Sequence, residues 1–139
     1  MYYIGVDLGT SAVKLLLMEG NGKIANIVSK EYPLYFPHPG WSEQKPEDWW
    51  EAVKCGLKEL VAGYDASKVA GISFGGQMHG LVILDKDDQV IRPAILWNDG
   101  RTQEETDYLN NVIGKDKLSQ YTANIAFTGF TAPKVLWVK

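Results

Sequence analysis

The chain has 139 residues, of which 45% are apolar and 22% charged, a balance typical of one globular domain with its own core. Its net charge of −3 excludes a broad basic surface, so we expect neither nucleic acid nor an acidic membrane as a partner. One cysteine, Cys55, excludes an internal disulfide, and the first five residues lack the basic start of a secretory signal. We therefore expect a cytoplasmic protein.

The first third of the chain predicts an antiparallel meander. Residues 2–7 and 12–18 are apolar runs separated by a turn, and Asn21-Gly22 is a strong hairpin signal before an alternating run at 24–32. Both faces of the second run carry apolar residues, which predicts burial between two layers: Val13, Leu15 and Leu17 on one face, Ala12 and Leu16 on the other.

A loop and a helix follow. Residues 33–44 contain three prolines and predict an ordered loop. Pro46 suits the first turn of a helix, and Glu47 and Asp48 match the positive end of its dipole. The apolar face expected of this helix has helical spacing: Trp50, Val53, Leu57, Leu60 and Val61.

The second half mixes short strands with helices. Strands are expected at 69–74, 81–84 and 94–97, the last joining the main sheet, with a turn at Asp87-Asp88. Thr102 and Glu105 form a capping-box pattern that predicts a helix through about Ile113, and a further helix is expected from residue 133. We expect most of the five tryptophans to lie in the core.

This order of elements predicts the α/β class, with a mixed sheet whose first strands are antiparallel and whose faces are covered by helices. Neither the P-loop pattern G-x-x-x-x-G-K-[ST] nor the dinucleotide pattern G-x-G-x-x-G occurs in the chain. A nucleotide would have to be bound by another device.

The strongest candidate for that device is the turn at residues 7–11. Asp7 ends a buried strand, and its carboxylate could hold Mg²⁺ through water. Gly9 allows a close approach of the backbone, while Thr10 and Ser11 offer hydroxyls that could meet phosphate oxygens. Lys14 could face either the phosphates or solvent. The alternative is a hairpin turn in which these residues serve structure alone.

A second candidate is the glycine-flanked segment 77–79 at the end of a predicted strand, where α/β sheets place ligands. Gln77 and His79 can each donate and accept hydrogen bonds, which suits a polyhydroxylated substrate, and Met78 can fill an apolar gap beside it. The alternative is a loop whose His79 merely caps backbone groups.

A third candidate lies at residues 97–101, where Asp99 and Arg101 could pair and Trp97 could wall a pocket. Here the structural interpretation is favoured, namely a turn between a strand and a helix that is held by an ion pair.

Several segments together resemble the FGGY carbohydrate kinases, a family within the actin, hexokinase and heat-shock ATPase superfamily. Residues 1–17 resemble its first phosphate motif. Residues 39–44 and 46–50 resemble the loop and helix that follow there, and residues 129–138 (G-x-T-A-P-K-V-x-W-V) resemble the family's first signature. Within the family, Gln77-Met78-His79-Gly80 is similar to the segment of the xylulose kinases, whereas glycerol kinases carry a Gln-Arg-Glu type of segment.

The resemblance implies a ribonuclease-H-like fold, of which residues 1–139 would be the N-terminal part of the first of two kinase domains. It implies transfer of the γ-phosphoryl group of ATP to the 5-hydroxyl of D-xylulose, with Mg²⁺ as metal cofactor. Asp7 would contact the metal, and the phosphates would meet Gly9, Thr10, Ser11 and Lys14. The implied sugar contacts are Gln77, Met78, His79, Asp99 and Arg101.

Two other functions stay open at this stage. One is another sugar kinase of the family, acting on gluconate, ribulose, glycerol or a deoxy-sugar. The other is a non-catalytic, actin-like ATP-binding module. The resemblance places the catalytic aspartate beyond Lys139, so the 139 residues alone are expected to be inactive. The longer enzyme could be a homodimer, while the isolated fragment is expected to self-associate through surfaces that later segments would cover.

Overall fold

The computed structural model describes all residues 1–139, and they divide into two compact units. Unit 1 consists of Met1–Leu34 and Pro46–Gln77, and unit 2 consists of Tyr35–Lys45 and Met78–Lys139. No helix is long and apolar enough to cross a membrane.

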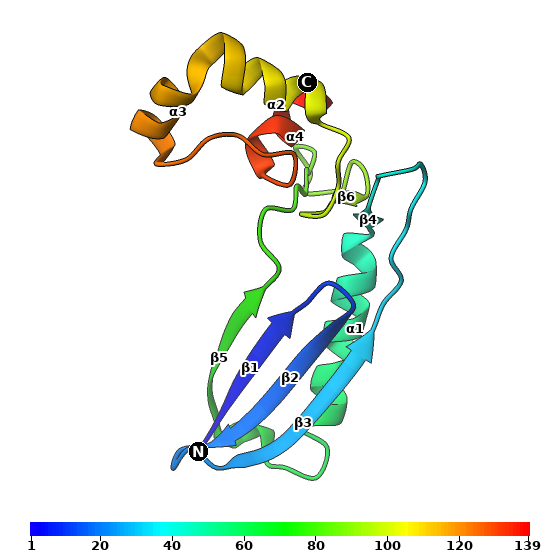
Figure 1. The fold of residues 1–139 in the computed structure, drawn as a ribbon. Helices are drawn as coiled ribbons and strands as arrows, with labels where there is room; N and C mark the ends of the chain where they lie inside the picture. The colour runs from blue at the N-terminus through cyan, green and yellow to red at the C-terminus, as the bar shows by residue number, and fades with distance from the viewer. The chain divides into compact units, whose positions relative to one another are not determined.

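Unit 1 is built on a four-stranded sheet with the strand order β3-β2-β1-β5 (Figure 1). β1 (Tyr2–Leu8), β2 (Ala12–Glu19) and β3 (Ile24–Glu31) are antiparallel neighbours, which confirms the predicted meander. The hairpin between β2 and β3 turns at Gly22, whose φ of +89° is a conformation that favours glycine. β5 (Val69–Gly76) pairs parallel to β1, so these two strands end at the same edge of the sheet.

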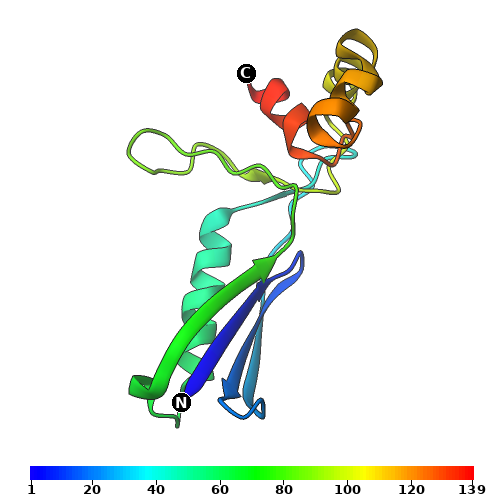
Figure 2. The ribbon, with the colours of Figure 1, turned by 90° about the vertical axis from the view of Figure 1, so that its left-hand side faces the viewer.

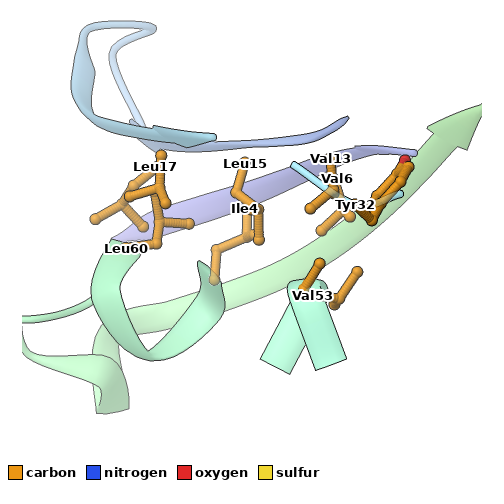
Figure 3. Packing of buried hydrophobic residues seen from close by; sticks show 10 residues of the cluster. Ile4, Val6, Val13, Leu15, Leu17, Tyr32, Val53 and Leu60 are labelled. Atoms are coloured by element: carbon orange, nitrogen blue, oxygen red, sulfur yellow. The ribbon is translucent and has the colours of Figure 1, made fainter. Parts of the chain in front are cut away.

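Helix α1 (Pro46–Leu60) covers one face of this sheet (Figure 2). The core between them is apolar and comprises Ile4, Val6, Val13, Leu15, Leu17, Val28, Tyr32, Ala52, Val53 and Leu60 (Figure 3). Helix α1 is therefore one of the two layers that were expected to bury β2. On the other face of the sheet Ile27 and Phe74 remain 57% and 69% exposed.

The predicted apolar face of α1 is wrong at its first residue. Trp50 is 60% exposed, with Lys54 over its ring, whereas its neighbour Trp49 packs against the core. Trp50 lies at the border of the apolar stripe, and spacing alone does not settle which of two consecutive tryptophans turns inward. A short 3₁₀ turn, η1 (Ala66–Lys68), leads from the helix region into β5, and the Asp65 carboxylate caps it by accepting from the Ser67 N–H at 3.1 Å.

Unit 2 carries its own two-stranded sheet, in which β4 (Glu43–Gln44) pairs antiparallel with β6 (Ala94–Ile95). The expectation that residues 94–97 join the main sheet is therefore wrong. The strand expected at 81–84 is also wrong, since only single bridges form, from Leu81 to Ile95 and from Leu84 to Val90. The turn at Asp87-Asp88 is confirmed by the Asp88 N–H, which donates to the Asp85 carbonyl at 3.1 Å.

The helices of unit 2 are α2 (Gln103–Asp107), a π-helical segment (Tyr108–Gly114), α3 (Lys115–Thr122) and α4 (Thr131–Val138). A helix is present where the capping box predicted one, but the box itself does not form. Thr102 is buried, and its hydroxyl donates to the Thr128 carbonyl at 3.1 Å instead of capping α2. The expectation of mostly buried tryptophans is wrong too, because Trp50 and Trp97 are exposed and the other three are half-buried.

Candidate functional site

Two of the predicted motifs meet in unit 1, at the shared edge of β1 and β5. The turn after β1 contains Thr10, and β5 runs directly into Gln77. The Gln77 N–H donates to the Leu8 carbonyl at 2.8 Å, and the Thr10 hydroxyl lies 3.3 Å from the Gln77 Oε1 atom. The parallel pairing of β1 with β5 thus brings together residues that are 67 positions apart in the sequence.

The turn is tight and needs its glycine. The Gly9 N–H donates to the Ala12 carbonyl at 3.1 Å. A Cβ atom at Gly9 would lie 2.9 Å from that same carbonyl oxygen, closer than side-chain carbons come to backbone. The predicted glycine is therefore required by the geometry of the turn, with Thr10 half-buried and Ser11 exposed beside it.

Tyr32 holds this turn from the end of β3, and sequence reasoning missed it. Its hydroxyl donates to the Gly9 carbonyl, and its own N–H donates to the Ser11 carbonyl at 3.3 Å. Burial, together with the nearby negative charge of Asp7, raises the pKa of Tyr32 to about 12. The only signal in the sequence was the position of a tyrosine at the end of the third strand.

Asp7 and Lys14 are partners across β1 and β2, and because their neighbours Val6 and Val13 face the core, they lie on the sheet face that α1 does not cover. Both side chains are exposed and line an open hollow of about 410 Å³, together with the apolar Leu16, Ile27 and Phe74. No group of three or more acidic, histidine or cysteine side chains forms a metal cage here. A single exposed carboxylate next to a tight turn fits Mg²⁺, which usually keeps several waters and takes one or two carboxylates plus phosphate oxygens.

In unit 2, Met78 and His79 follow β5. Met78 is 68% exposed. His79 has a φ of +65°, which is uncommon for a residue other than glycine, and its ring stacks on Phe130 with centroids 4.4 Å apart and planes 19° apart. His79 and Phe130 line a hollow of about 270 Å³, whose other walls include Leu109, Ile125 and Pro133.

Lys134 belongs to α4, and its side chain is fully buried next to the backbone of His79. Its ammonium donates to the carbonyls of His79 at 2.8 Å and of Gly129 at 2.6 Å. Burial lowers the pKa of Lys134 to about 8, with the charge of Asp99 opposing that shift and the charge of Arg101 adding to it. From the sequence, Lys134 was recognised only as part of the family signature at residues 129–138, and no role was predicted for it.

Asp99 and Arg101 form the predicted ion pair, with Arg101 Nη2 2.7 Å from Asp99 Oδ2, and a third residue, Glu43, joins them at 2.8 Å from Arg101 Nη1. The Asp99 and Arg101 side chains are at most 1% exposed. Burial opposes ionisation of Asp99, but hydrogen bonds from Arg101 and from the Ser42 N–H outweigh it and lower its pKa. The Arg101 guanidinium lies 3.7 Å from the ring centroid of Trp41, and Trp97 is half exposed nearby in sequence.

Chemically, the two units offer different groups. Unit 1 presents a carboxylate, hydroxyls and a tight turn at the ends of two parallel strands, an arrangement suited to a metal-bound phosphate chain. Unit 2 presents a histidine ring on an aromatic support beside a largely apolar hollow, which suits a small polar ligand with an apolar face.

Comparison with known proteins assigns the family. Residues 2–139 match the model of the FGGY family of carbohydrate kinases, N-terminal domain. Curated xylulose kinases from Bacillus subtilis and Klebsiella pneumoniae are 51% and 47% identical to this chain over 99% of its length, and the chain spans 28% of each. A solved structure of a xyloylose kinase from Brucella ovis is 42% identical with a TM-score of 0.93, covering 99% of this chain and 29% of that one. The match over almost every residue shows that the chain belongs to the FGGY family of carbohydrate kinases.

Proposed function

We propose that this chain is the N-terminal segment of a longer kinase, here called the parent kinase, that transfers the γ-phosphoryl group of ATP to the 5-hydroxyl of D-xylulose. The observation that carries the proposal is the identity of 47–51% with two curated xylulose kinases along the whole chain. The single cysteine and the ATP requirement support a cytoplasmic location.

In this proposal unit 1 binds the phosphates. Asp7 would hold Mg²⁺ through water, and the bound metal would supply positive charge to offset the negative charge of the transferring group. Thr10 and Ser11 donate from hydroxyl and backbone groups to phosphate oxygens, with Gly9 allowing the close approach. Lys14, exposed beside Asp7 on the same face, adds a positive charge for the phosphate chain.

Unit 2 contributes to the sugar site. His79 donates or accepts at a sugar hydroxyl, and Met78 contacts the carbon skeleton, in line with its exposure. Gln77, the last residue of unit 1, is the second polar candidate. Asp99 and Arg101 are already paired and buried, so we assign them to support of the site and not to direct contact with sugar.

The test uses two variants of the parent kinase in an assay coupled to ADP release. Asp7→Asn is expected to lower turnover by orders of magnitude, because several kcal/mol of metal-dependent charge stabilisation are lost. D-Xylulose binding without nucleotide, measured by calorimetry, is expected to survive. Asp116→Asn, at an exposed acid of α3, is the matched control. Near-normal turnover in Asp7→Asn would leave the turn with a structural role only.

The second variant, His79→Ala, is expected to raise KM for D-xylulose and leave KM for ATP nearly unchanged. The variant loses one hydrogen bond to a sugar hydroxyl, which contributes about 1 kcal/mol of binding free energy. A panel of D-xylulose, D-ribulose, gluconate and glycerol decides the sugar. Absence of turnover with all four would instead favour the non-catalytic, actin-like module.

A further inference from the structure

A fully buried lysine is unusual, because removing an ammonium group from water costs several kcal/mol unless it is compensated. Lys134 has no exposed surface and makes no ion pair with any carboxylate. Its direct hydrogen-bond acceptors are two backbone carbonyls, those of His79 at 2.8 Å and Gly129 at 2.6 Å. The two carbonyls belong to residues that are 50 positions apart in the sequence, and the Lys134 ammonium donates to both.

The two carbonyls belong to the two halves of one aromatic contact. His79 carries one, and Gly129 directly precedes Phe130, on which the His79 ring stacks at 4.4 Å. The ammonium therefore joins the backbone of the histidine to the backbone next to its stacking partner. Gly129 is itself closely fitted, since a Cβ atom there would lie 2.3 Å from the Trp97 carbonyl oxygen.

The backbone of His79 also needs support. Its φ of +65° is disfavoured for a residue with a Cβ atom, so the conformation persists only when its surroundings hold it. This conformation determines where the His79 carbonyl and ring point. The Lys134 ammonium donates to that carbonyl at 2.8 Å.

We propose that Lys134 is a positioning residue for sugar recognition, which fixes the backbone and ring of His79 through the clamp formed by its ammonium and the carbonyls of His79 and Gly129. The proposal rests on the sugar-binding role of His79 proposed above. Lys134 does not touch the sugar, because its charged end is enclosed by protein and its donors are directed at backbone.

A methionine at this position keeps the length and the apolar stem but has no donor, so it leaves both carbonyls unpaired. In the parent kinase, Lys134→Met is expected to raise KM for D-xylulose by about tenfold, the equivalent of losing one to two buried hydrogen bonds. KM for ATP is expected to stay within about twofold, since the phosphate turn of unit 1 makes no use of this clamp. Lys117→Met, at an exposed lysine of α3, is the matched control and should match the wild type.

A double-mutant cycle separates positioning from general destabilisation. If Lys134 acts through His79, the variant with both Lys134→Met and His79→Ala should have a KM for D-xylulose within about twofold of His79→Ala alone. Lys134→Arg, which retains a buried donor, should restore part of the affinity, and it serves as the test variant if Lys134→Met does not fold.

Three results would overturn the inference: an unchanged KM for D-xylulose in folded Lys134→Met, an equal rise in the KM values of both substrates in either Lys134 variant, or additive effects in the cycle. Its failure is distinguishable from failure of the proposed sugar site. If His79→Ala raises the sugar KM and Lys134→Met does not, only the positioning role is lost. If His79→Ala itself leaves the sugar KM unchanged, the sugar-binding role of His79 fails and the inference fails with it.

Discussion

Gly75 and Gly76, the last two residues of β5, allow a matched test of the candidate site at the shared edge of β1 and β5. Gly76 lies opposite Leu8 in the parallel register, and a Cβ atom there would be 2.8 Å from the Leu8 carbonyl oxygen and 3.0 Å from the Leu8 Cβ. At Gly75 a Cβ atom would meet nothing within 4 Å. Neither residue has a positive φ, so the two positions differ in packing and not in backbone strain.

The size of the effect follows from that contact. Reaching the ordinary contact distance of 3.4 Å from 2.8 Å requires a shift of about 0.6 Å between β1 and β5. Gln77 follows the end of β5, so this shift would displace its N–H from the Leu8 carbonyl and its Oε1 atom from the Thr10 hydroxyl. Overpacking of this kind costs about 1–3 kcal/mol, and misplacement of a site by less than 1 Å can lower kcat/KM by about tenfold or more.

The assay compares Gly76→Ala with Gly75→Ala in the parent kinase, by thermal melting and by kcat/KM for ATP. We expect Gly76→Ala to lose at least about tenfold in kcat/KM and to melt at a lower temperature, while Gly75→Ala stays close to the wild type. Equal behaviour of the two variants would refute the reasoning, because it would mean that the close approach of β5 to Leu8 does not shape the site.

The remaining predictions concern Tyr32, Lys134 and the isolated chain. Tyr32→Phe should raise KM for ATP and cost about 1 kcal/mol of stability, with the exposed Tyr121→Phe as control. Because the pKa of Tyr32 is raised from 10.0 to about 12, its stabilising contribution should be complete below pH 10 and disappear as the pH rises to 12; a melting-temperature difference between wild type and Tyr32→Phe that is constant over this range would contradict it. Because the pKa of Lys134 is lowered from 10.5 to about 8, the unfolded chain binds more protons between these values, so wild-type stability relative to Lys134→Met should rise from pH 8 to 10.5 in urea unfolding. The 139 residues alone should release no ADP with D-xylulose and should self-associate in light scattering through the uncovered sheet face at Ile27 and Phe74. A monomer with a cooperative melt would show that this face needs no cover.

Features set by neighbours in the sequence were predicted well. The meander, the Asn21-Gly22 hairpin, α1, β5 and the last helix are encoded in local patterns of alternation, turn residues and helical spacing. The ion pair of Asp99 with Arg101 was foreseen for the same reason, since its members are two residues apart. The turn at Asp7 and the segment at Gln77 were each recognised, although their contact was not.

Features that depend on distant partners could not be read from the sequence. Strands of two residues, such as β4 and β6, are too short to show an alternating pattern, so their pairing could not be predicted from the sequence. Thr102 matched a capping box, but its burial next to the Thr128 carbonyl gave its hydroxyl another acceptor. Tyr32 and Lys134 act through backbone carbonyls far along the chain, and no local pattern distinguishes such residues from ordinary ones.

The parallel pairing of β1 with β5 has a consequence for the order in which the protein folds. β1 and β2 are joined by a short turn and can pair early, whereas β5 must close a loop of more than 60 residues before it reaches β1, which is entropically slower. During synthesis, the meander can form before Gln77 has left the ribosome, so the turn at residues 7–11 would exist for a time without its partner. In pulse-labelling hydrogen exchange, the amides between β1 and β2 should gain protection before the Gln77 amide, which donates to the Leu8 carbonyl. The proposed phosphate site of unit 1 would then be completed in the last stage of folding of its sheet.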